Sequence, residues 1–146
     1  VVPVHRPEEA AEDMDIIITA TTSCEPVLNG DWLSEGTHIN AIGSNALNRA
    51  ELDVATIRRA DTIVADSVEQ CQLEAGDFVA ALDQGALHWP NVHELADVIA
   101  GRKTGRQTLE SITLFKSLGL AIEDLAVAAR VFEMAKDRGV GRELPW

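Results

Sequence analysis

Hydroxyl, amide and glycine residues gather where two short apolar runs end. Thr19 follows the apolar run at residues 16–18, and the triplet Gly43-Ser44-Asn45 follows the run at residues 38–42. Loops that leave the carboxyl ends of parallel strands face the ligand crevice of an open α/β sheet. These side chains can therefore exchange hydrogen bonds with a small polar ligand, and Gly43 lets it approach the backbone closely. Plain turns and strand ends use the same residue types, so a purely structural role is the alternative.

Two more loops are expected at the same edge of the sheet. Residues 66–67 follow an apolar run, and residues 116–119 connect the last apolar run to a long helix. Ser117 is expected to cap that helix, with free N–H groups behind it that form an anion site, unless the cap serves the helix alone. Together the four loops offer hydroxyls, glycines, one amide and, in Lys116, one ammonium. This inventory suits a ribose, a nicotinamide amide or a carboxylate rather than a metal ion or a hydrolytic triad.

Phosphate and metal motifs are missing from the chain. Neither GxGxxG nor GxxxxGK[ST] occurs, so no pyrophosphate cradle of a known kind is expected. None of the four histidines lies at metal-ligand spacing from another histidine or a cysteine. Cys24 and Cys71 match neither a metal motif nor a disulfide framework, and we expect both to be reduced thiols in a cytoplasmic protein.

The charge and composition narrow the class of partner. The formal net charge is -12 over 146 residues, which repels phosphate backbones and anionic lipids, so neither nucleic acid nor a membrane is an expected partner. With 46% hydrophobic and 25% charged residues, the chain has the composition of one globular domain with a real core. The first residue is Val1 rather than Met, so we expect a chain that is trimmed or cut from something longer.

Short apolar runs alternate with helical stretches, which is typical of βαβ units and a parallel sheet. Three successive isoleucines at residues 16–18 predict a strand buried on both faces. The last helix is predicted from apolar residues at helical spacing, namely Leu118, Ile122, Leu125, Ala129 and Phe132. Strands are predicted at residues 1–4, 15–20, 38–42, 61–65 and 111–116, and helices at residues 7–12, 31–34, 51–59, 67–75, 78–83, 91–101 and 118–139.

Five segments, in order, resemble one known family. They are DIIITATTSCEPVL, GTHINAIGSNALNRAELD, ADTIVADSVEQCQLEAGD, ITLFKSLGLAIEDLAVA and RGVGRELP. The chain resembles the C-terminal half of the ornithine cyclodeaminase/mu-crystallin family, which also includes alanine dehydrogenases and ketimine reductases. The resemblance implies a partial Rossmann-type α/β fold: a doubly wound parallel sheet with helices on both faces and a long C-terminal helix. Residues 1–117 would be the C-terminal half of an NAD(P) domain, and residues 118–146 would return toward the substrate and dimerisation domain.

The resemblance also implies roles for single residues. Thr19 would lie near the cofactor ribose, and Ile42 with Gly43-Ser44-Asn45 would line the nicotinamide side. Ser117 would touch the cofactor, and Leu118 would touch the substrate as well. The family's glycine-rich loop, its ribose-binding acidic residue and its substrate-binding arginine and lysine would all precede Val1, so none of them can be carried over to this chain.

Two departures from the cyclodeaminase pattern shift the expected reaction. Asn45 stands where cyclodeaminases carry an aspartate as general acid/base, and an amide does not exchange a proton at working pH. Arg49 stands where they carry a lysine; it can balance cofactor charge but cannot act as a base. Both changes favour imine or ketimine reduction, or an amino-acid dehydrogenase, over ornithine cyclisation.

The leading hypothesis is the C-terminal part of an NAD- or NADP-dependent enzyme that transfers hydride at the α-carbon of small amino or imino acids, as a homo-oligomer. By this hypothesis the chain alone neither binds NAD tightly nor turns over substrate. The alternatives are a truncated, non-catalytic half-domain that persists as a folded oligomer, and a small-ligand-binding protein. The oligomer would cover the open sheet edge near residues 1–4 and the apolar face of the last helix.

Overall fold

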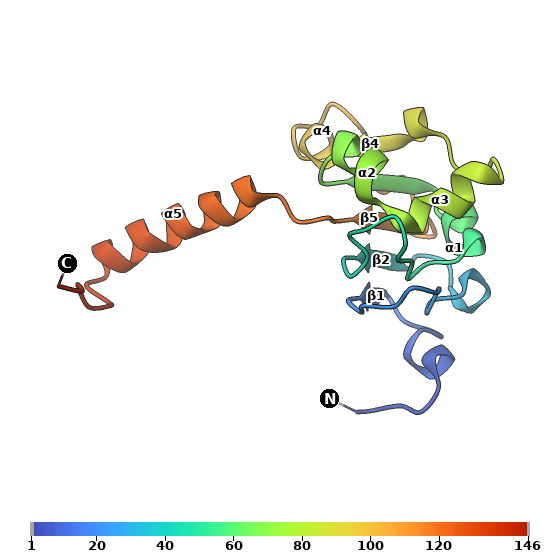
Figure 1. The fold of residues 1–146 in the computed structure, drawn as a ribbon, viewed down its shortest axis with the longest axis horizontal. Helices are drawn as coiled ribbons and strands as arrows, with labels where there is room; N and C mark the ends of the chain where they lie inside the picture. Colours follow the sequence, from blue (N-terminus) through green and yellow to red (C-terminus); the bar gives the residue numbers. More distant parts are fainter. Residues whose placement is uncertain (1, 146) are drawn as a thin grey trace.

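The computed structural model describes residues 2–145 and contains a five-stranded sheet in which every pairing is parallel (Figure 1). The strand order is β1-β2-β5-β3-β4, so the last strand in the sequence lies at the centre of the sheet. This arrangement confirms the predicted α/β class. The strands are β1 (Ile16–Thr19), β2 (His38–Ala41), β3 (Thr62–Ala65), β4 (Val92–Glu94) and β5 (Thr113–Lys116).

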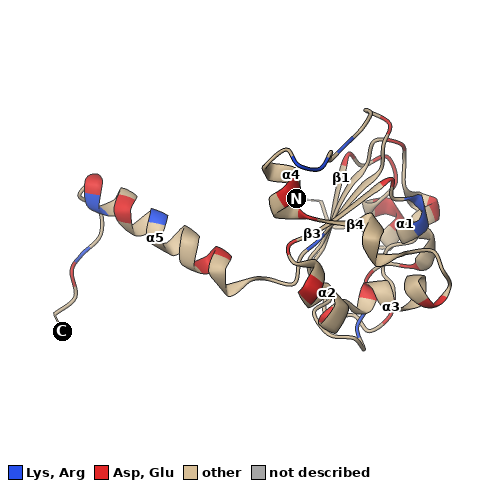
Figure 2. Ribbon diagram, turned by 90° about the horizontal axis from the view of Figure 1, so that it is seen from above, with Lys and Arg blue, Asp and Glu red and all other residues tan. Residues whose placement is uncertain are grey.

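Helices cover the two faces of the sheet unequally. The α-helices are α1 (Val54–Arg59), α2 (Val68–Glu74), α3 (Gly76–Asp83), α4 (Leu95–Ile99) and α5 (Ala121–Asp137), and 3-10 turns form at η1 (Pro7–Ala10), η2 (Gly30–Trp32) and η3 (Trp89–Asn91). Helices α1 and α3 lie on one side of the sheet and α4 on the other (Figure 2). The expectation of helices on both faces is therefore confirmed, although the second face carries little cover.

The core lies between the sheet and the α1–α3 face. Ile39 of β2 and Leu114 of β5 point to this side and are 0% and 1% exposed. Ile57 of α1 and Phe78 of α3 are likewise almost fully buried in the same apolar cluster. Burial of large apolar side chains is the main favourable term in folding, so this single layer of contacts carries most of the stability of the domain.

The opposite face of the sheet is largely bare, which corrects one expectation. In β1, Ile17 is 7% exposed, but Ile16 and Ile18 are 62% and 61% exposed, so this strand is not buried on both faces. Within residues 2–145, β1 pairs with β2 alone and so lies at the edge of the sheet. Consecutive strand residues point to opposite faces, and the exposure of Ile16 and Ile18 shows that little covers β1 on its second face.

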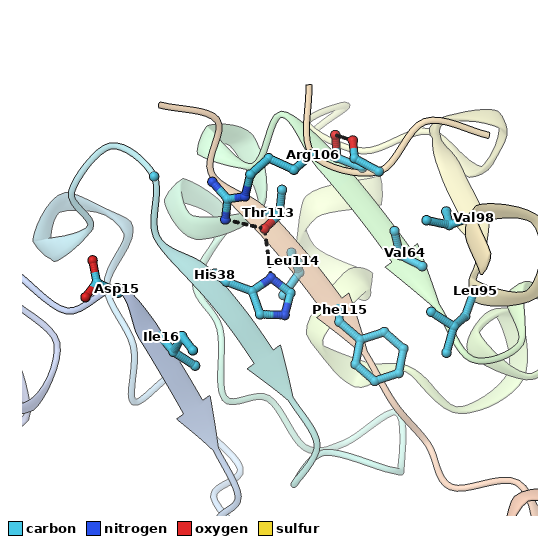
Figure 3. Close-up of a pocket in the computed structure, with 13 residues that line it drawn as sticks. Asp15, Ile16, His38, Val64, Leu95, Val98, Arg106, Thr113, Leu114 and Phe115 are labelled. Atoms are coloured by element: carbon cyan, nitrogen blue, oxygen red, sulfur yellow. Dashed lines mark hydrogen bonds between the residues drawn. The ribbon is translucent and has the colours of Figure 1, made fainter. Parts of the chain in front are cut away.

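A hollow of about 660 Å³ lies on this bare face, near the amino ends of the strands (Figure 3). His38 and Arg106 stand at its polar end, where Arg106 Nη2 donates to the Thr113 hydroxyl at 3.0 Å and His38 Nδ1 lies 2.7 Å from the same oxygen. Burial lowers the pKa of His38, a hydrogen bond with Asn40 opposes this, and the nearby Arg106 charge adds to the lowering. These polar groups satisfy one another, and they lie at the edge of the sheet opposite the predicted ligand crevice.

Several element boundaries differ from the predictions. Val1 lies outside the described residues, and Val2–Val4 form no strand; the predicted helix at residues 7–12 is only the 3-10 turn η1. The predicted helix at residues 51–59 begins at Val54, because Asp53 accepts the Thr56 N–H at 2.7 Å and so caps it.

The predicted helix at residues 91–101 is divided into strand β4 and the short helix α4. Val92 pairs with Ile63 of β3 and is 6% exposed, so sheet pairing and burial override the capping pattern that predicted a helix there.

Helix α5 is the longest element, and it projects away from the sheet (Figure 1). The predicted helix is confirmed, but its residues are all at least partly exposed, with Ile122, Leu125 and Phe132 at 71%, 68% and 69%. Residues 117–120 connect it to β5 without helical structure. Within residues 2–145, no helix combines the length and apolar character that crossing a membrane requires.

Candidate functional site

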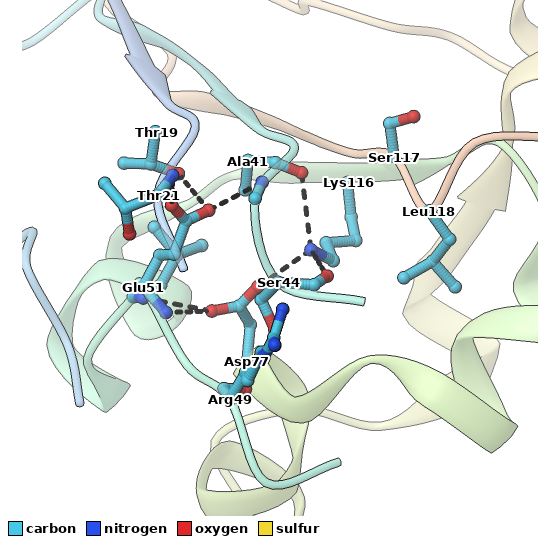
Figure 4. A network of polar contacts seen from close by, with 12 residues as sticks. Thr19, Thr21, Ala41, Ser44, Arg49, Glu51, Asp77, Lys116, Ser117 and Leu118 are labelled. Atoms are coloured by element: carbon cyan, nitrogen blue, oxygen red, sulfur yellow. Dashed lines mark hydrogen bonds and ion pairs between the residues drawn. The ribbon is translucent and has the colours of Figure 1, made fainter. Parts of the chain in front are cut away.

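The loops predicted to form a crevice do leave the same edge of the sheet. Strands β1, β2, β3 and β5 run parallel, so the segments after Thr19, Ala41, Ala65 and Lys116 all emerge at their carboxyl ends. Because β2 lies between β1 and β5, the loop that contains residues 43–45 sits between the loops at residues 20–23 and 117–119. Figure 4 shows the polar contacts behind these loops.

A buried carboxylate, Glu51, joins the first two loops. Its side chain is 0% exposed, and Oε2 accepts the Thr19 hydroxyl at 2.9 Å and the Gly43 N–H at 2.8 Å. Its other oxygen, Oε1, accepts the Thr21 N–H at 2.5 Å. Burial alone would raise the pKa of Glu51, but hydrogen bonds from Thr21, Thr19 and Gly43 outweigh it and leave the pKa lowered. The carboxylate is therefore ionised at neutral pH and ties the end of β1 to the end of β2.

A buried ion pair lies behind the second and third loops. The Lys116 ammonium is 0% exposed and lies 2.9 Å from Asp77 Oδ2. It also donates to the carbonyl of Ser44 at 2.5 Å and to that of Ala41 at 3.4 Å. The prediction that this ammonium is available to a ligand is therefore wrong, because residues of its own chain surround it.

Asp77 extends the same network to the chain around Glu51. Its Oδ1 accepts the backbone N–H groups of Glu51 at 2.6 Å and of Leu52 at 3.1 Å. Asp77 is in the first turn of α3, and its Oδ2 pairs with Lys116. Glu51, Asp77 and Lys116 thus form one buried cluster of three charges, which we call the charge cluster.

A third carboxylate, Asp66, organises the loop after β5. Its Oδ2 accepts the Ser117 hydroxyl at 2.9 Å, the Leu118 N–H at 2.7 Å and the Gly119 N–H at 3.0 Å. The predicted anion site at this place is wrong, because these N–H groups already bind a carboxylate that would repel another anion.

The predicted cap of the last helix is also wrong. Helix α5 begins at Ala121, and its N-cap position is Leu120, which makes no side-chain cap. Ser117 lies outside the helix, and its hydroxyl is used by Asp66.

Two of the predicted binding residues turn their hydroxyls inward. Ser44 is 0% exposed, and its Oγ donates to the carbonyl of Arg49 at 2.8 Å. Thr19 is 6% exposed, and its hydroxyl donates to Glu51. Arg49 itself is half-buried, beside the loop. The structure brings these residues together with the loop, but it uses the hydroxyls of Ser44 and Thr19 for internal hydrogen bonds.

The remaining predicted residues lie on the accessible loop surface at this edge of the sheet, which we call the crevice rim. Ile42 is 46% exposed and Asn45 is exposed, with Gly43 half-buried between the two strand ends. Ser117 and Leu118 are half-buried on the neighbouring loop. The rim therefore offers one apolar side chain, one amide and the backbone of residues 42–45.

Sequence reasoning placed Asp66 in a loop at this edge but missed its buried contacts, and it missed Glu51 and Asp77 altogether. Asp66 directly follows an apolar run in VADS, whereas Glu51 in AELD and Asp77 in AGDF each lie between small or apolar residues. A carboxylate in such a position is seldom buried unless it is paired or hydrogen-bonded, which is the signal that identifies these three.

The described residues 2–145 hold no group of three or more histidine, cysteine or acidic side chains placed to bind a metal ion. Both cysteines are free thiols. Cys24 is exposed in the loop after β1, whereas Cys71 is buried in α2. Burial raises the pKa of Cys71 to about 12, with a further contribution from the Asp66 charge, so this thiol is inert at neutral pH.

Comparisons with known proteins identify the family of this chain. The family model of the ornithine cyclodeaminase/mu-crystallin family matches residues 1–139. The chain belongs to this family. It is 42% identical over 140 residues to the alanine dehydrogenase of Archaeoglobus fulgidus, covering 95% of this chain and 43% of that protein.

Two solved structures share the fold of this family member. The Δ1-pyrroline-2-carboxylate reductase of Thermococcus litoralis, in complex with NADH and L-proline, is 43% identical with a TM-score of 0.86; the match covers 97% of this chain and 44% of the reductase. An archaeal alanine dehydrogenase dimer with bound NAD is 41% identical with a TM-score of 0.82; the match covers 99% of this chain and 44% of that chain. The chain thus spans less than half the length of these relatives.

Proposed function

We propose that this chain forms the nicotinamide-side half of the cofactor domain of an NAD(P)-dependent enzyme acting on small amino or imino acids. The observation that carries the proposal is the crevice rim at residues 42–45, on a family member whose solved relatives bind NAD or NADH. The reaction type would be hydride transfer at the α-carbon, as in an imine or ketimine reductase or an amino-acid dehydrogenase.

The donor set of the crevice suits one end of such a cofactor. The rim carries Ile42 and Asn45, while the nearest lysine ammonium, Lys116, is buried and paired. A flat, amide-bearing ring fits an apolar side chain flanked by hydrogen-bonding groups, whereas a pyrophosphate needs cations or free N–H groups. The N–H groups of the loop after β5 are occupied by Asp66. The pyrophosphate end would therefore rest on parts of the parent protein other than these loops.

Bound NAD(P) would supply the hydride donor or acceptor. The residues of this chain bind and orient: Ile42 offers an apolar surface to the ring, and the Asn45 side chain both donates and accepts hydrogen bonds. Asn45 does not carry a proton at working pH, and Arg49 stays charged. These two residues support reduction over a cyclodeaminase reaction that needs a carboxylate at the position of Asn45.

The proposal is tested by titrating the isolated chain with NAD⁺ and following the backbone amides by NMR. We expect no micromolar binding by isothermal titration, and millimolar NAD⁺ to shift amides at residues 42–45 and 117–118 only. Micromolar binding would contradict the view that this chain holds only half of the site. Millimolar NAD⁺ leaving these amides unshifted would contradict the assignment of the crevice.

A second candidate function is a non-catalytic half-domain that persists as a homo-oligomer. It is favoured by the exposure of α5, whose apolar residues Ile122, Leu125 and Phe132 face solvent, and by the unpaired edge of β1. Such edges and apolar faces promote association. Light scattering coupled to size-exclusion chromatography tests it: a dimer or larger species supports self-association, and a clean monomer contradicts it.

A further inference from the structure

We propose that two copies of this chain associate by exchanging helix α5: the apolar stripe of α5 from one copy packs into the hollow on the bare sheet face of the other, and the contact is made in both directions. The proposal deepens the homo-oligomer put forward above and rests on it. It does not depend on NAD(P) binding, because the hollow lies near the amino ends of the strands, away from the crevice loops.

The first surface is one side of α5. With about 100° between successive helical residues, Ile122, Leu125 and Phe132 fall on one stripe, with Ala128 and Ala129 beside them. The three large side chains are all exposed, and no residue of α5 is buried. A helix with such a stripe is stable in water when the stripe is packed against another apolar surface.

The second surface is the hollow. The parallel register places Ile18 of β1, Phe115 of β5 and Val64 of β3 in one row across the bare face. Leu95 and Val98 of α4 continue the apolar lining beyond β3 (Figure 3). The chain therefore exposes two apolar surfaces, one convex and one concave, and neither covers the other within one copy.

The two surfaces match in size. The lining of the hollow comes from β1, β2, β5 and β3 as well as α4, and four strands about 4.8 Å apart span about 15 Å. A helix with its side chains is about 10–12 Å across, and the 17 residues of α5 extend over about 25 Å. One helix laid along the strands therefore fills the hollow, as α1 and α3 cover the other face of the sheet (Figure 2).

Charge complementarity favours α5 as the occupant. Arg106, at the polar end of the hollow, donates to two carbonyls and to the Thr113 hydroxyl, and no carboxylate in residues 2–145 lies at ion-pair distance from it. Helix α5 carries four carboxylates and two cations, and Asp124 lies beside the apolar stripe. In a chain with a net charge of -12, an uncompensated cation at the hollow attracts this acidic helix and offsets part of the repulsion between copies.

The linker explains why α5 does not cover the hollow of its own copy. Residues 117–120 connect β5 to α5, and Asp66 holds three of them through the Ser117 hydroxyl and the N–H groups of Leu118 and Gly119. Both views show α5 leaving the domain without turning back over the sheet (Figure 1, Figure 2). With its linker anchored in this way, α5 can reach the bare face of a second copy. Such exchange of an identical element between protomers produces closed dimers.

The first experiment measures the molecular mass of the intact 146-residue chain by size-exclusion chromatography with light scattering over a range of concentrations. We expect a dimer that dissociates on dilution. Phe132→Asp on α5 and Ile16→Asp at the hollow should each raise the dissociation constant by about tenfold or more, because each places an unpaired carboxylate in an apolar contact. Both residues are exposed within one copy, so circular dichroism should show that the variants remain folded.

Two control variants change exposed apolar residues elsewhere. Val127 lies on the side of α5 away from the stripe, and Leu73 lies on α2, outside the hollow. Val127→Asp and Leu73→Asp should change the dissociation constant by no more than about twofold. A wild-type chain that stays monomeric overturns both the exchange and the homo-oligomer. A dimer that all four variants weaken equally, or that none of them weakens, overturns the exchange alone.

The second experiment mixes the two interface variants. In a dimer of Phe132→Asp with Ile16→Asp, one contact joins an intact α5 to an intact hollow, whereas each variant alone has only defective contacts. The mixture should therefore form dimers at concentrations at which each variant alone is monomeric. A mixture that stays monomeric overturns the exchange. An Ile16→Asp chain that dimerises as tightly as wild type also overturns it, because two α5 helices would then pack on each other.

The third experiment locates the contact in the wild-type dimer. In a sample that mixes isotope-labelled and unlabelled copies, filtered NMR should show nuclear Overhauser effects between the Leu125 methyl groups of one copy and the Phe115 ring or Val98 methyl groups of the other. A dimer without these intermolecular effects overturns the exchange. None of the substitutions alters a crevice loop, so failure of the exchange leaves the NAD⁺ titration as an independent test of the cofactor proposal.

Discussion

The crevice loops and helix α5 adjoin each other in the chain, yet they are held in opposite ways. The crevice loops are fixed from within by Glu51, Asp66 and the Lys116–Asp77 pair, all of them buried. Helix α5, which follows Lys116 after residues 117–120, has no buried residue at all. The crevice loops are therefore held by the domain itself, whereas the apolar residues of α5 have no covering surface within residues 2–145.

The largest expected effect comes from breaking the ion pair of the charge cluster. Lys116→Met leaves Asp77 buried without its cation, and removing one partner of such a pair costs about 3–5 kcal/mol. Urea unfolding of the variant measures the loss. The double variant Lys116→Met/Asp77→Asn removes the orphaned charge and should recover part of it; a double variant no more stable than the single one would show that the charge is not the cause.

The next effect comes from the pH dependence of Glu51. Because hydrogen bonds lower the pKa of this carboxyl in the folded protein, its contribution is complete above the unfolded pKa and is lost as pH falls through the folded pKa. Glu51→Gln should therefore lose about 1.5–3 kcal/mol at neutral pH, a gap that narrows below about pH 4. Paired urea titrations of wild type and variant across this range provide the measurement, and a gap independent of pH would contradict the lowered pKa.

A smaller effect is expected from crowding the loop. Gly43→Ala places a methyl group against Glu51 Oε1 and the Thr21 backbone, and overpacking of this kind costs about 1–3 kcal/mol. The matched control is Gly105→Ala, where the nearest atom is the flexible Val98 Cγ1 at 3.2 Å and little change is expected. Thermal unfolding of both variants distinguishes a specific close approach from a general intolerance of loop substitutions.

The smallest effect is expected from the opposite region. Deleting residues 121–146 removes α5, which buries nothing against the domain, and should change the unfolding free energy of a monomer by no more than about 0.5 kcal/mol. Most helical stability in proteins comes from the packing of an apolar face, so the helical circular dichroism of α5 should also be weak unless a partner covers it. If the deletion instead causes a large loss of stability and also converts an oligomer into a monomer, α5 is part of a subunit interface.

The same contrast explains what could be predicted from the sequence. The central strands near Ile39, Ile63 and Leu114 were predictable because β-branched or apolar runs mark buried parallel strands. Strand β4 was not, because three residues carry too little pattern and its pairing with β3 is a long-range contact. The burial of Ile16–18 was overestimated, since a sequence does not say which strand lies at an edge.

The position of the candidate loops was predictable, whereas the contacts of their side chains were less so. The strand-end rule and the family resemblance both identify the loop at residues 43–45, which leaves the predicted edge of the sheet. The inward turn of the Ser44 and Thr19 hydroxyls was not predictable, because it depends on Glu51 and on a backbone carbonyl that spacing alone does not place nearby. Lys116 was likewise assigned to the crevice because its partner, Asp77, is distant in the sequence.

The two cysteines have a practical consequence for following the crevice in solution. Because the Cys71 thiol is buried and its pKa is raised to about 12, a maleimide dye or a spin label at neutral pH should react with Cys24 alone. Cys24 lies in the loop after β1, three residues beyond the Thr21 N–H that Glu51 holds. The unaltered chain thus carries a single addressable spectroscopic reporter, close to the anchoring point of this loop.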